Sequence, residues 1–228
     1  MRIILFDIDG TLLRTGAGRR SMEQALRATF GTPGDPSYRY DGKTDRQIIR
    51  EAMRLAGFDD ATIDERRAAT EALYLESLRD EVRSTEGATL LPGVRALVDA
   101  VVAHDGLIPG LLTGNVAEGA ALKLNAVGLD PLAFVVGAFG SDHEIRAELP
   151  AIARSRAEAH LGRAVAGEAI VIVGDTPADI QCGRGIGARA VAVATGRYAR
   201  EELASHGPHA VFEDLSDTAA VLATLERC

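Results

Sequence analysis

The sequence is poor in several features that mark particular protein classes. Its 228 residues include two cysteines, Cys182 and Cys228, which form neither a disulfide framework nor a metal-ligand spacing. No apolar run approaches the ~20 residues that a membrane span needs. The N-terminus has an acidic strand end where a signal peptide would have its apolar centre. We therefore expect a reduced, cytoplasmic setting and no membrane partner.

Positive charge is also scarce. Lys and Arg total 25 against 33 Asp and Glu, and the formal net charge is −8. Nucleic-acid-binding proteins usually carry a basic patch, and none is visible, so nucleic acid is not an expected partner. A small anionic ligand would need local positive charge or a metal to overcome this acidic background. The length suits one large domain, or one domain with an insertion.

Short apolar runs alternate with amphipathic stretches along most of the chain. Buried strands are predicted at RIILF (2–6), LIPGLL (107–112), AFVVG (133–137), AIVIVG (169–174), ARAVAVA (188–194) and HAVF (209–212). Helices are predicted at about 93–104, 117–127, 148–161, 177–186 and 216–225. This alternation predicts an α/β fold, a doubly wound, Rossmann-like parallel sheet with helices on both faces.

One region interrupts the alternation. Between residues 16 and 87 there is no convincing strand, and helices are predicted at 21–30, 44–58 and 61–82. We expect residues 1–15 and 88–228 to form the core and residues 16–87 to form an inserted α-helical domain. The run LLPGV at 90–94 should then return the chain to the sheet.

Polar clusters stand at the ends of three predicted strands. They are the runs DIDGT at 7–11, TGN at 113–115 and GDTPAD at 174–179. Ligands of open parallel sheets bind beyond the carboxyl ends of the strands. We expect the strand that ends at Asp7 to lie between those that end at Thr113 and Asp175, so that the clusters converge.

Converging carboxylates are unfavourable without a counter-charge. Two unit charges ~4 Å apart repel by ~4 kcal/mol at an effective dielectric constant of ~20. Either some carboxylates stay protonated or a cation lies among them. Hard oxygen ligands with no His or Cys nearby suit Mg²⁺, which favours one or two carboxylates together with phosphate oxygens. The expected cofactor is Mg²⁺.

The runs DIDGTLL, LLTGN and VGDTPADI resemble motifs one, two and four of the haloacid dehalogenase (HAD) superfamily. Residues 195–217 resemble the tail of its phosphoglycolate-phosphatase-type members, and the helical insertion is similar to the small α-helical cap of the phosphoglycolate phosphatase and β-phosphoglucomutase subgroup. The resemblance covers nearly the whole chain.

The resemblance implies a role for each polar strand end. Asp7 is the nucleophile that forms an aspartyl-phosphate, and Asp9 is the general acid and then the general base. The remaining implied roles are metal ligation by Asp7, Asp175 and the Asp9 main-chain carbonyl, support of the metal by Asp179, and phosphate binding by Thr113, Gly114 and Asn115.

The function implied is that of an enzyme, a Mg²⁺-dependent phosphatase acting on a small phosphorylated metabolite. A phosphomutase of the β-phosphoglucomutase type is the alternative, because it shares the motifs. True dehalogenases usually lack the second aspartate of motif one, so Asp9 favours phosphoryl transfer. Intact Asp7 and Asp9 argue against a non-catalytic binding protein. Either a monomer or a homodimer is compatible with the sequence.

The third motif departs from the family pattern. The lysine expected before motif four is replaced, and Arg146 holds that position in HEIRAELPAIA. Lys123, on the helix after motif two, is the alternative. We favour Lys123 as the cation that touches Asp7 and phosphate, with Arg146 in a supporting ion pair. In the insertion, Lys43 and Thr44 are candidate substrate contacts, although helix capping by Thr44 or Asp45 explains that run equally well.

Overall fold

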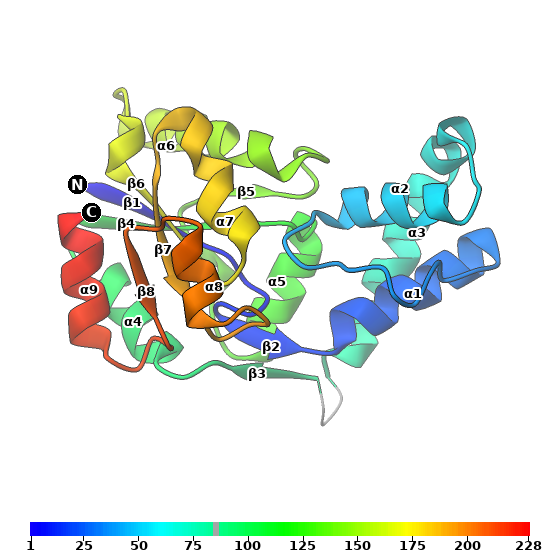
Figure 1. The fold of residues 1–228 in the computed structure, drawn as a ribbon, viewed down its shortest axis with the longest axis horizontal. Coiled ribbons are helices and arrows are strands. Elements are labelled where there is room, and N and C mark those ends of the chain that lie inside the picture. The colour runs from blue at the N-terminus through cyan, green and yellow to red at the C-terminus, as the bar shows by residue number, and fades with distance from the viewer. Residues whose placement is uncertain (84–86) are drawn as a thin grey trace.

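The computed structural model describes residues 1–83 and 87–228, and its larger body is built around a six-stranded sheet, on the left in Figure 1. The strand order is β5-β4-β1-β6-β7-β8, and every neighbouring pair is parallel. The strands are β1 (Arg2–Phe6), β4 (Leu107–Thr113), β5 (Val136–Phe139), β6 (Ile170–Gly174), β7 (Arg189–Val193) and β8 (Ala210–Phe212). The predicted doubly wound α/β class is confirmed.

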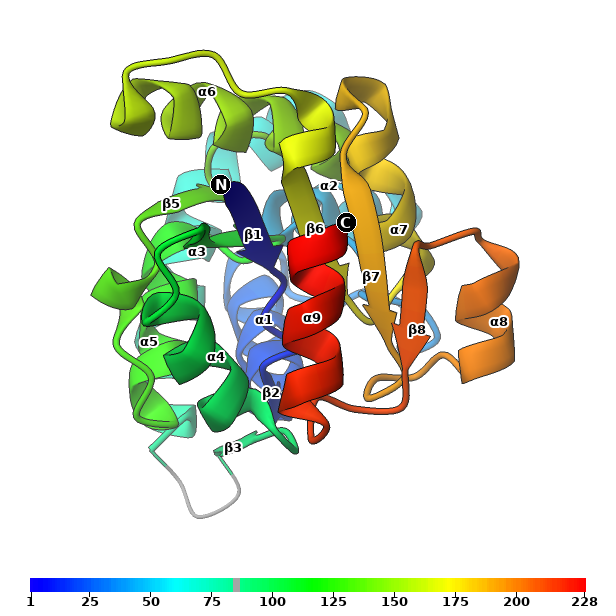
Figure 2. The ribbon, with the colours of Figure 1, turned by 90° about the vertical axis from the view of Figure 1, so that its left-hand side faces the viewer.

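Helices cover both faces of this sheet (Figure 2). One face packs against α4 (Val94–Val102), α5 (Ala117–Ala126) and α9 (Thr218–Arg227), and the other packs against α6 (Leu149–Leu161) and α7 (Pro177–Cys182). Side chains of β1 alternate between the two cores: Ile4 and Phe6 join the first, and Ile3 and Leu5 join the second. Burial on both faces explains why the strands read as continuous apolar runs.

The inserted helices form a second body beside the sheet (Figure 1). They are α1 (Ala17–Phe30), α2 (Asp45–Leu55) and α3 (Asp60–Glu81), and they share an apolar core that includes Met22, Ile49 and Tyr74. We call this body the cap. The domain boundaries 1–15, 16–87 and 88–228 stay a prediction, and residues 84–86 of that range lie outside the described residues.

The cap is joined to the core by a short antiparallel pair that the sequence did not predict. Strand β2 (Leu13–Thr15) pairs with β3 (Ala88–Leu90) in a separate two-stranded sheet. The expectation that the chain re-enters the main sheet at 90–94 is therefore wrong. Each of these strands has three residues, which is too short for a clear alternating pattern.

Element ends differ from expectation in a few places. Strand β5 begins at Val136 instead of residue 133, because the preceding residues Pro131–Ala133 form a 3₁₀ turn. Helix α8 (Arg200–Ser205) has no counterpart among the predicted helices. Among the described ranges 1–83 and 87–228, no helix combines the length and the apolar character that crossing a membrane requires.

Candidate active site

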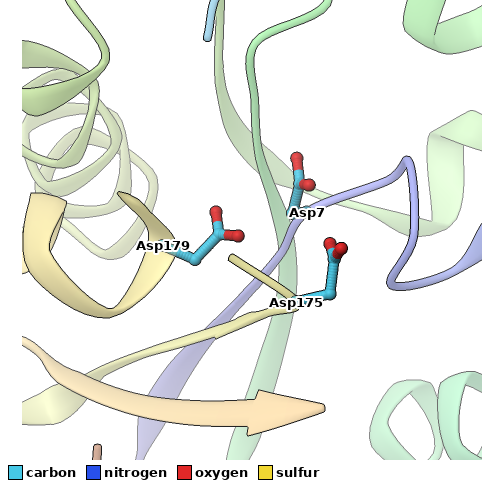
Figure 3. A group of neighbouring side chains, drawn as sticks. All are labelled: Asp7, Asp175 and Asp179. Atoms are coloured by element: carbon cyan, nitrogen blue, oxygen red, sulfur yellow. The ribbon is translucent and has the colours of Figure 1, made fainter. Parts of the chain in front are cut away.

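Three carboxylates meet at the carboxyl edge of the central strands (Figure 3). Asp7 directly follows β1, Asp175 follows β6, and Asp179 lies in α7. All three are buried, and one oxygen atom from each lies within 4.8 Å of one from each of the others. The predicted neighbours are correct, since β1 pairs with β4 on one side and β6 on the other.

A tight turn after Asp9 leaves room for this cluster. Gly10 has φ +86°, and a Cβ atom there would lie 2.4 Å from Oδ2 of Asp175. Its N–H donates to the Leu13 carbonyl at 2.8 Å. The next hydroxyl, Thr11 Oγ1, donates to Oδ1 of Asp175 at 3.1 Å. Only glycine fits both this backbone conformation and this close approach.

Asp179 is fixed by the start of its own helix. Thr176 and Asp179 form a capping box, in which Oδ2 of Asp179 accepts from the Thr176 N–H at 3.0 Å and from its hydroxyl at 2.6 Å. The other oxygen, Oδ1, accepts from Arg146. Because both oxygens have protein partners, the geometry fits a supporting position for Asp179 beside Asp7 and Asp175.

The cluster is electrostatically strained in the absence of a further cation. Burial raises the pKa of Asp7 to about 7, with Asp179 and Asp9 adding to the rise and Arg146 opposing it. Burial, with Asp179 and Asp7, also raises the pKa of Asp175. An all-oxygen set of buried carboxylates that resist ionisation fits a divalent cation, which would favour their charged forms.

Arg146 is the cation that reaches the predicted nucleophile. It lies at the start of the 3₁₀ turn Arg146–Glu148, before α6, and it is buried. Its Nη2 is 3.2 Å from Oδ1 of Asp7 and also pairs with Asp179. Burial alone would lower the pKa of Arg146, but Asp179 and Asp7 raise it above its ordinary value.

Lys123 takes a different partner. It is also buried, and its Nζ lies 2.6 Å from Oδ2 of Asp9 and 2.6 Å from Oδ1 of Asn115. The expectation that Lys123 touches Asp7, with Arg146 in support, is therefore wrong. The side chain of Lys123 runs back toward the N-terminus of α5, as helical side chains do, and meets Asp9 there.

The predicted phosphate-binding residues line the same place. Thr113 ends β4, and Asn115 Nδ2 donates both to its hydroxyl at 2.8 Å and to Oδ2 of Asp9 at 2.7 Å. Asn115 therefore fixes Asp9 together with Lys123. The carbonyl of Gly114 accepts from the N–H of Asp45 in the cap at 2.8 Å.

The two cap candidates have different surroundings. Lys43 lines the cavity between cap and core, but its Nζ is held by Glu51 at 2.6 Å and by the Tyr38 hydroxyl at 2.9 Å. Thr44 is not among the described residues that line it. Its hydroxyl caps α2 by accepting from the Gln47 N–H, and it donates to the carbonyl of Glu144. The capping interpretation of Thr44 is correct.

Asp45 belongs to the site, although the sequence pattern marks it only as a possible capping residue of α2. It is buried, and Oδ2 accepts from the Val116 N–H at 2.8 Å. Burial raises the pKa of Asp45 to about 6, with Lys123 opposing the rise. The position of Asp45 in the polar run DGKTDRQ is the sequence signal that could have identified it as a site residue.

A cavity of about 570 Å³ lies over these groups, between cap and core. Its floor includes Asp7, Asp9 and Asp175, with Lys123 and Arg146. Its walls come from cap residues in the segment 36–45, from α1 and from the loop after β7. This volume is in the range of small-molecule sites. A cavity that encloses buried carboxylates, two cations and a candidate metal site can bind a phosphorylated small molecule.

Residues 149–218 match the model of the HAD-hydrolase-like family. No curated protein sequence matches the chain. Solved structures with the same fold include a hydrolase from Pseudomonas syringae, at TM-score 0.72 and 21% identity over 98% of both chains. A predicted phosphoglycolate phosphatase from Haemophilus somnus 129Pt has TM-score 0.70 and 20% identity over 97% of this chain and 98% of the other. CbbY from Rhodobacter sphaeroides, in complex with phosphate, has TM-score 0.68 and 21% identity over 99% of this chain and 100% of the other.

Proposed function

We propose that this chain is a Mg²⁺-dependent phosphatase of small phosphate monoesters, a function supported by its fold and by the match of residues 149–218 to the HAD-hydrolase-like model. The observation that carries the proposal is the pair of carboxylates on one turn after β1. Asp7 is buried beside Arg146 and Asp175, and the more exposed Asp9 is held by Lys123 and Asn115 in the same cavity. One carboxylate suits attack on phosphorus, and the other suits proton transfer.

The first step transfers the phosphoryl group to Asp7. A carboxylate oxygen of Asp7 forms a bond to phosphorus as the bond to the ester oxygen breaks, and Asp9 donates its proton to the departing alcohol. Arg146 stabilises charge at Asp7 and on the phosphoryl oxygens. The products are an aspartyl-phosphate, the free alcohol and an ionised Asp9.

The second step returns the enzyme to its starting state. Asp9 takes a proton from water, the water oxygen bonds to phosphorus, and the bond to Asp7 breaks. Phosphate leaves, and Asp7 is again a carboxylate. Lys123 and Asn115 hold the Asp9 carboxylate through both steps, which gives one group two successive roles.

The metal and phosphate sites follow from the donor set. Asp7, Asp175 and the Asp9 main-chain carbonyl would hold Mg²⁺, with Asp179 in support. The ion would neutralise charge on the phosphoryl oxygens and favour the ionised form of Asp7. Thr113 and the amides of Gly114 and Asn115 would bind the phosphate. CbbY, a structural relative, was solved with phosphate, which supports a phosphate site in this fold.

The test is hydrolysis of p-nitrophenyl phosphate with Mg²⁺ and with EDTA. We expect metal-dependent release of phosphate that Asp7→Asn abolishes, since the amide keeps the volume and loses the nucleophilic charge. Asp99→Asn, an exposed change in α4, is the matched control. Full activity of a clean Asp7→Asn preparation would refute the proposal. The phosphomutase alternative is separated by products: with β-glucose 1-phosphate it yields glucose 6-phosphate, and a phosphatase yields glucose and phosphate.

A further inference from the structure

One cation at the rim of the cavity, Arg197, has no counter-ion in the part of the chain that the structure describes. Arg197 lines the cavity from the core and is exposed, and no ion pair joins it to any carboxylate in the described ranges 1–83 and 87–228. The cap cations that line the same cavity are already paired: Arg19 with Glu23 at 2.7 Å, Lys43 with Glu51 at 2.6 Å, and Arg39 with Asp41 at 3.2 Å. Among the described cations at the rim of the cavity, Arg197 is therefore the one whose charge is not already balanced by a nearby carboxylate.

The backbone that carries Arg197 is fixed against the catalytic floor. Thr195 Oγ1 donates to the Gly10 carbonyl at 2.5 Å, and Arg14 Nη2 donates to the Thr195 carbonyl at 2.7 Å. A Cβ atom on Gly196 would lie 1.7 Å from Oδ2 of Asp175, so this glycine packs directly on the metal-site carboxylate. The next residue is thus held at a set position just above the floor.

The cap closes over the same loop. The guanidinium of Arg39, in the cap, lies 5.9 Å from the ring centroid of Tyr198, the neighbour of Arg197. Arg39 and Arg197 consequently stand at the same part of the rim, one from each body. The proposed phosphoryl site at the floor already has Arg146 beside Asp7, and Lys123 is held by Asp9, so an arginine at the rim would serve a different group.

We propose that Arg197 determines specificity by binding a second anionic group of the substrate, a carboxylate or a second phosphate, at the end away from the transferred phosphoryl group. This rests on the proposed phosphatase function and names its substrate class. A cavity of about 570 Å³ holds more than a phosphate ion, so both ends of such a substrate fit within it. An arginine fork binds either kind of anion through two parallel hydrogen bonds.

The experiment measures kcat/KM for two matched substrate pairs. 3-Phosphoglycerate is compared with glycerol 3-phosphate for the carboxylate, and fructose 1,6-bisphosphate with fructose 6-phosphate for the second phosphate. In the parent, at least one anionic member should exceed its neutral partner by about tenfold or more, the scale of a charged hydrogen bond. Arg197→Gln should bring that ratio close to one, and Arg197→Lys should retain part of it. The pair that responds identifies the anion.

Arg200→Gln is the matched control. This exposed arginine lies three residues on, in α8, pairs with Glu213 at 3.4 Å and does not line the cavity, so the ratios should match the parent. Equal kcat/KM within both pairs in the parent, or a preference that survives in Arg197→Gln, overturns the inference. So does turnover of p-nitrophenyl phosphate with none of the four alkyl phosphates. Absence of Mg²⁺-dependent activity on p-nitrophenyl phosphate is a different result, and it counts against the phosphatase function itself.

Discussion

Nη2 of Arg146 lies 3.2 Å from Oδ1 of Asp7. The two residues lie 139 positions apart in the sequence, and their contact puts an arginine where the HAD motif pattern that the sequence resembles has a lysine. The second buried cation, Lys123, meets Asp9 instead, at 2.6 Å. Arg146 thus contacts the proposed nucleophile, and Lys123 contacts the proposed acid and base. Removing either cation should therefore change the activity in a different way.

Removal of Arg146 should slow turnover strongly. Arg146→Ala leaves Asp7 and Asp179 without their cation, so kcat for p-nitrophenyl phosphate at saturating Mg²⁺ should fall by about 100-fold, the scale of one preorganised electrostatic contact. Arg146→Lys restores the charge without the planar fork and should recover part of that loss. Arg156→Ala, which removes an exposed arginine of α6, is the control. Near-parental kcat in a folded Arg146→Ala protein would remove Arg146 from the mechanism.

Loss of Lys123 should depend on the leaving group. Lys123 holds Asp9, the proposed proton donor, and alkyl alcohols need that proton far more than p-nitrophenol does. We expect Lys123→Ala to lower kcat/KM for glycerol 3-phosphate about tenfold more than for p-nitrophenyl phosphate. Asp9→Asn should show the same selectivity. A uniform loss on both substrates would mean that Lys123 serves phosphate binding instead of proton transfer.

Mg²⁺ should stabilise the fold through Asp175. A ligand present at 100 times its Kd stabilises the native state by about 2.7 kcal/mol, so Mg²⁺ should raise the Tm of the parent. Asp175→Asn should lose most of this response. In EDTA at pH 8 the same variant should melt no lower than the parent, because burial raises the pKa of Asp175 and its ionised form is disfavoured there. A full Mg²⁺ response in the variant would exclude Asp175 as a ligand.

Asp45 should make stability fall as pH rises. Its pKa in the folded protein is raised to about 6 from an ordinary value of 3.8, chiefly by burial. The folded state therefore holds the proton more tightly, and the resulting stabilisation is full below about pH 4 and is lost as pH rises through about 6. The Asp45→Asn variant has no titrating carboxyl at this position, so its stability does not fall with pH for this reason. Measured by urea unfolding in EDTA, the free energy of unfolding of the variant minus that of the parent should increase from pH 4 to pH 7 by up to about 3 kcal/mol.

Subtracting the free energy of unfolding of the parent from that of Asp45→Asn isolates the contribution of Asp45. Asp7 and Asp175 also have raised pKa values, but they contribute equally to both proteins and cancel in the difference. A difference that stays constant with pH would show that Asp45 keeps an ordinary pKa.

The three neighbouring strands that carry the site, and the residues at their ends, were readable from the sequence. Apolar runs such as RIILF can only be buried, and the polar group that follows each run must then lie at the sheet edge. Parallel connections put the carboxyl ends of β1, β4 and β6 at one edge, which is why the sequence by itself predicts that Asp7, Thr113 and Asp175 converge. The three-residue strands β2 and β3 were missed because no periodic pattern fits in so few residues.

Tertiary structure alone decided which cation meets which carboxylate. The side chains of Lys123 and Arg146 are both long enough to reach the floor of the cavity. Their positions in the sequence do not reveal the direction in which each side chain points. The axis of α5 brings Lys123 to Asp9, and the 3₁₀ turn before α6 brings Arg146 to Asp7. The placement of Arg197 at the rim of the cavity is likewise decided by tertiary structure alone. A single exposed arginine in a loop has no sequence signature, and its meaning comes from Gly196 packing on Asp175 and from the ion pairs that its neighbours across the cavity already have.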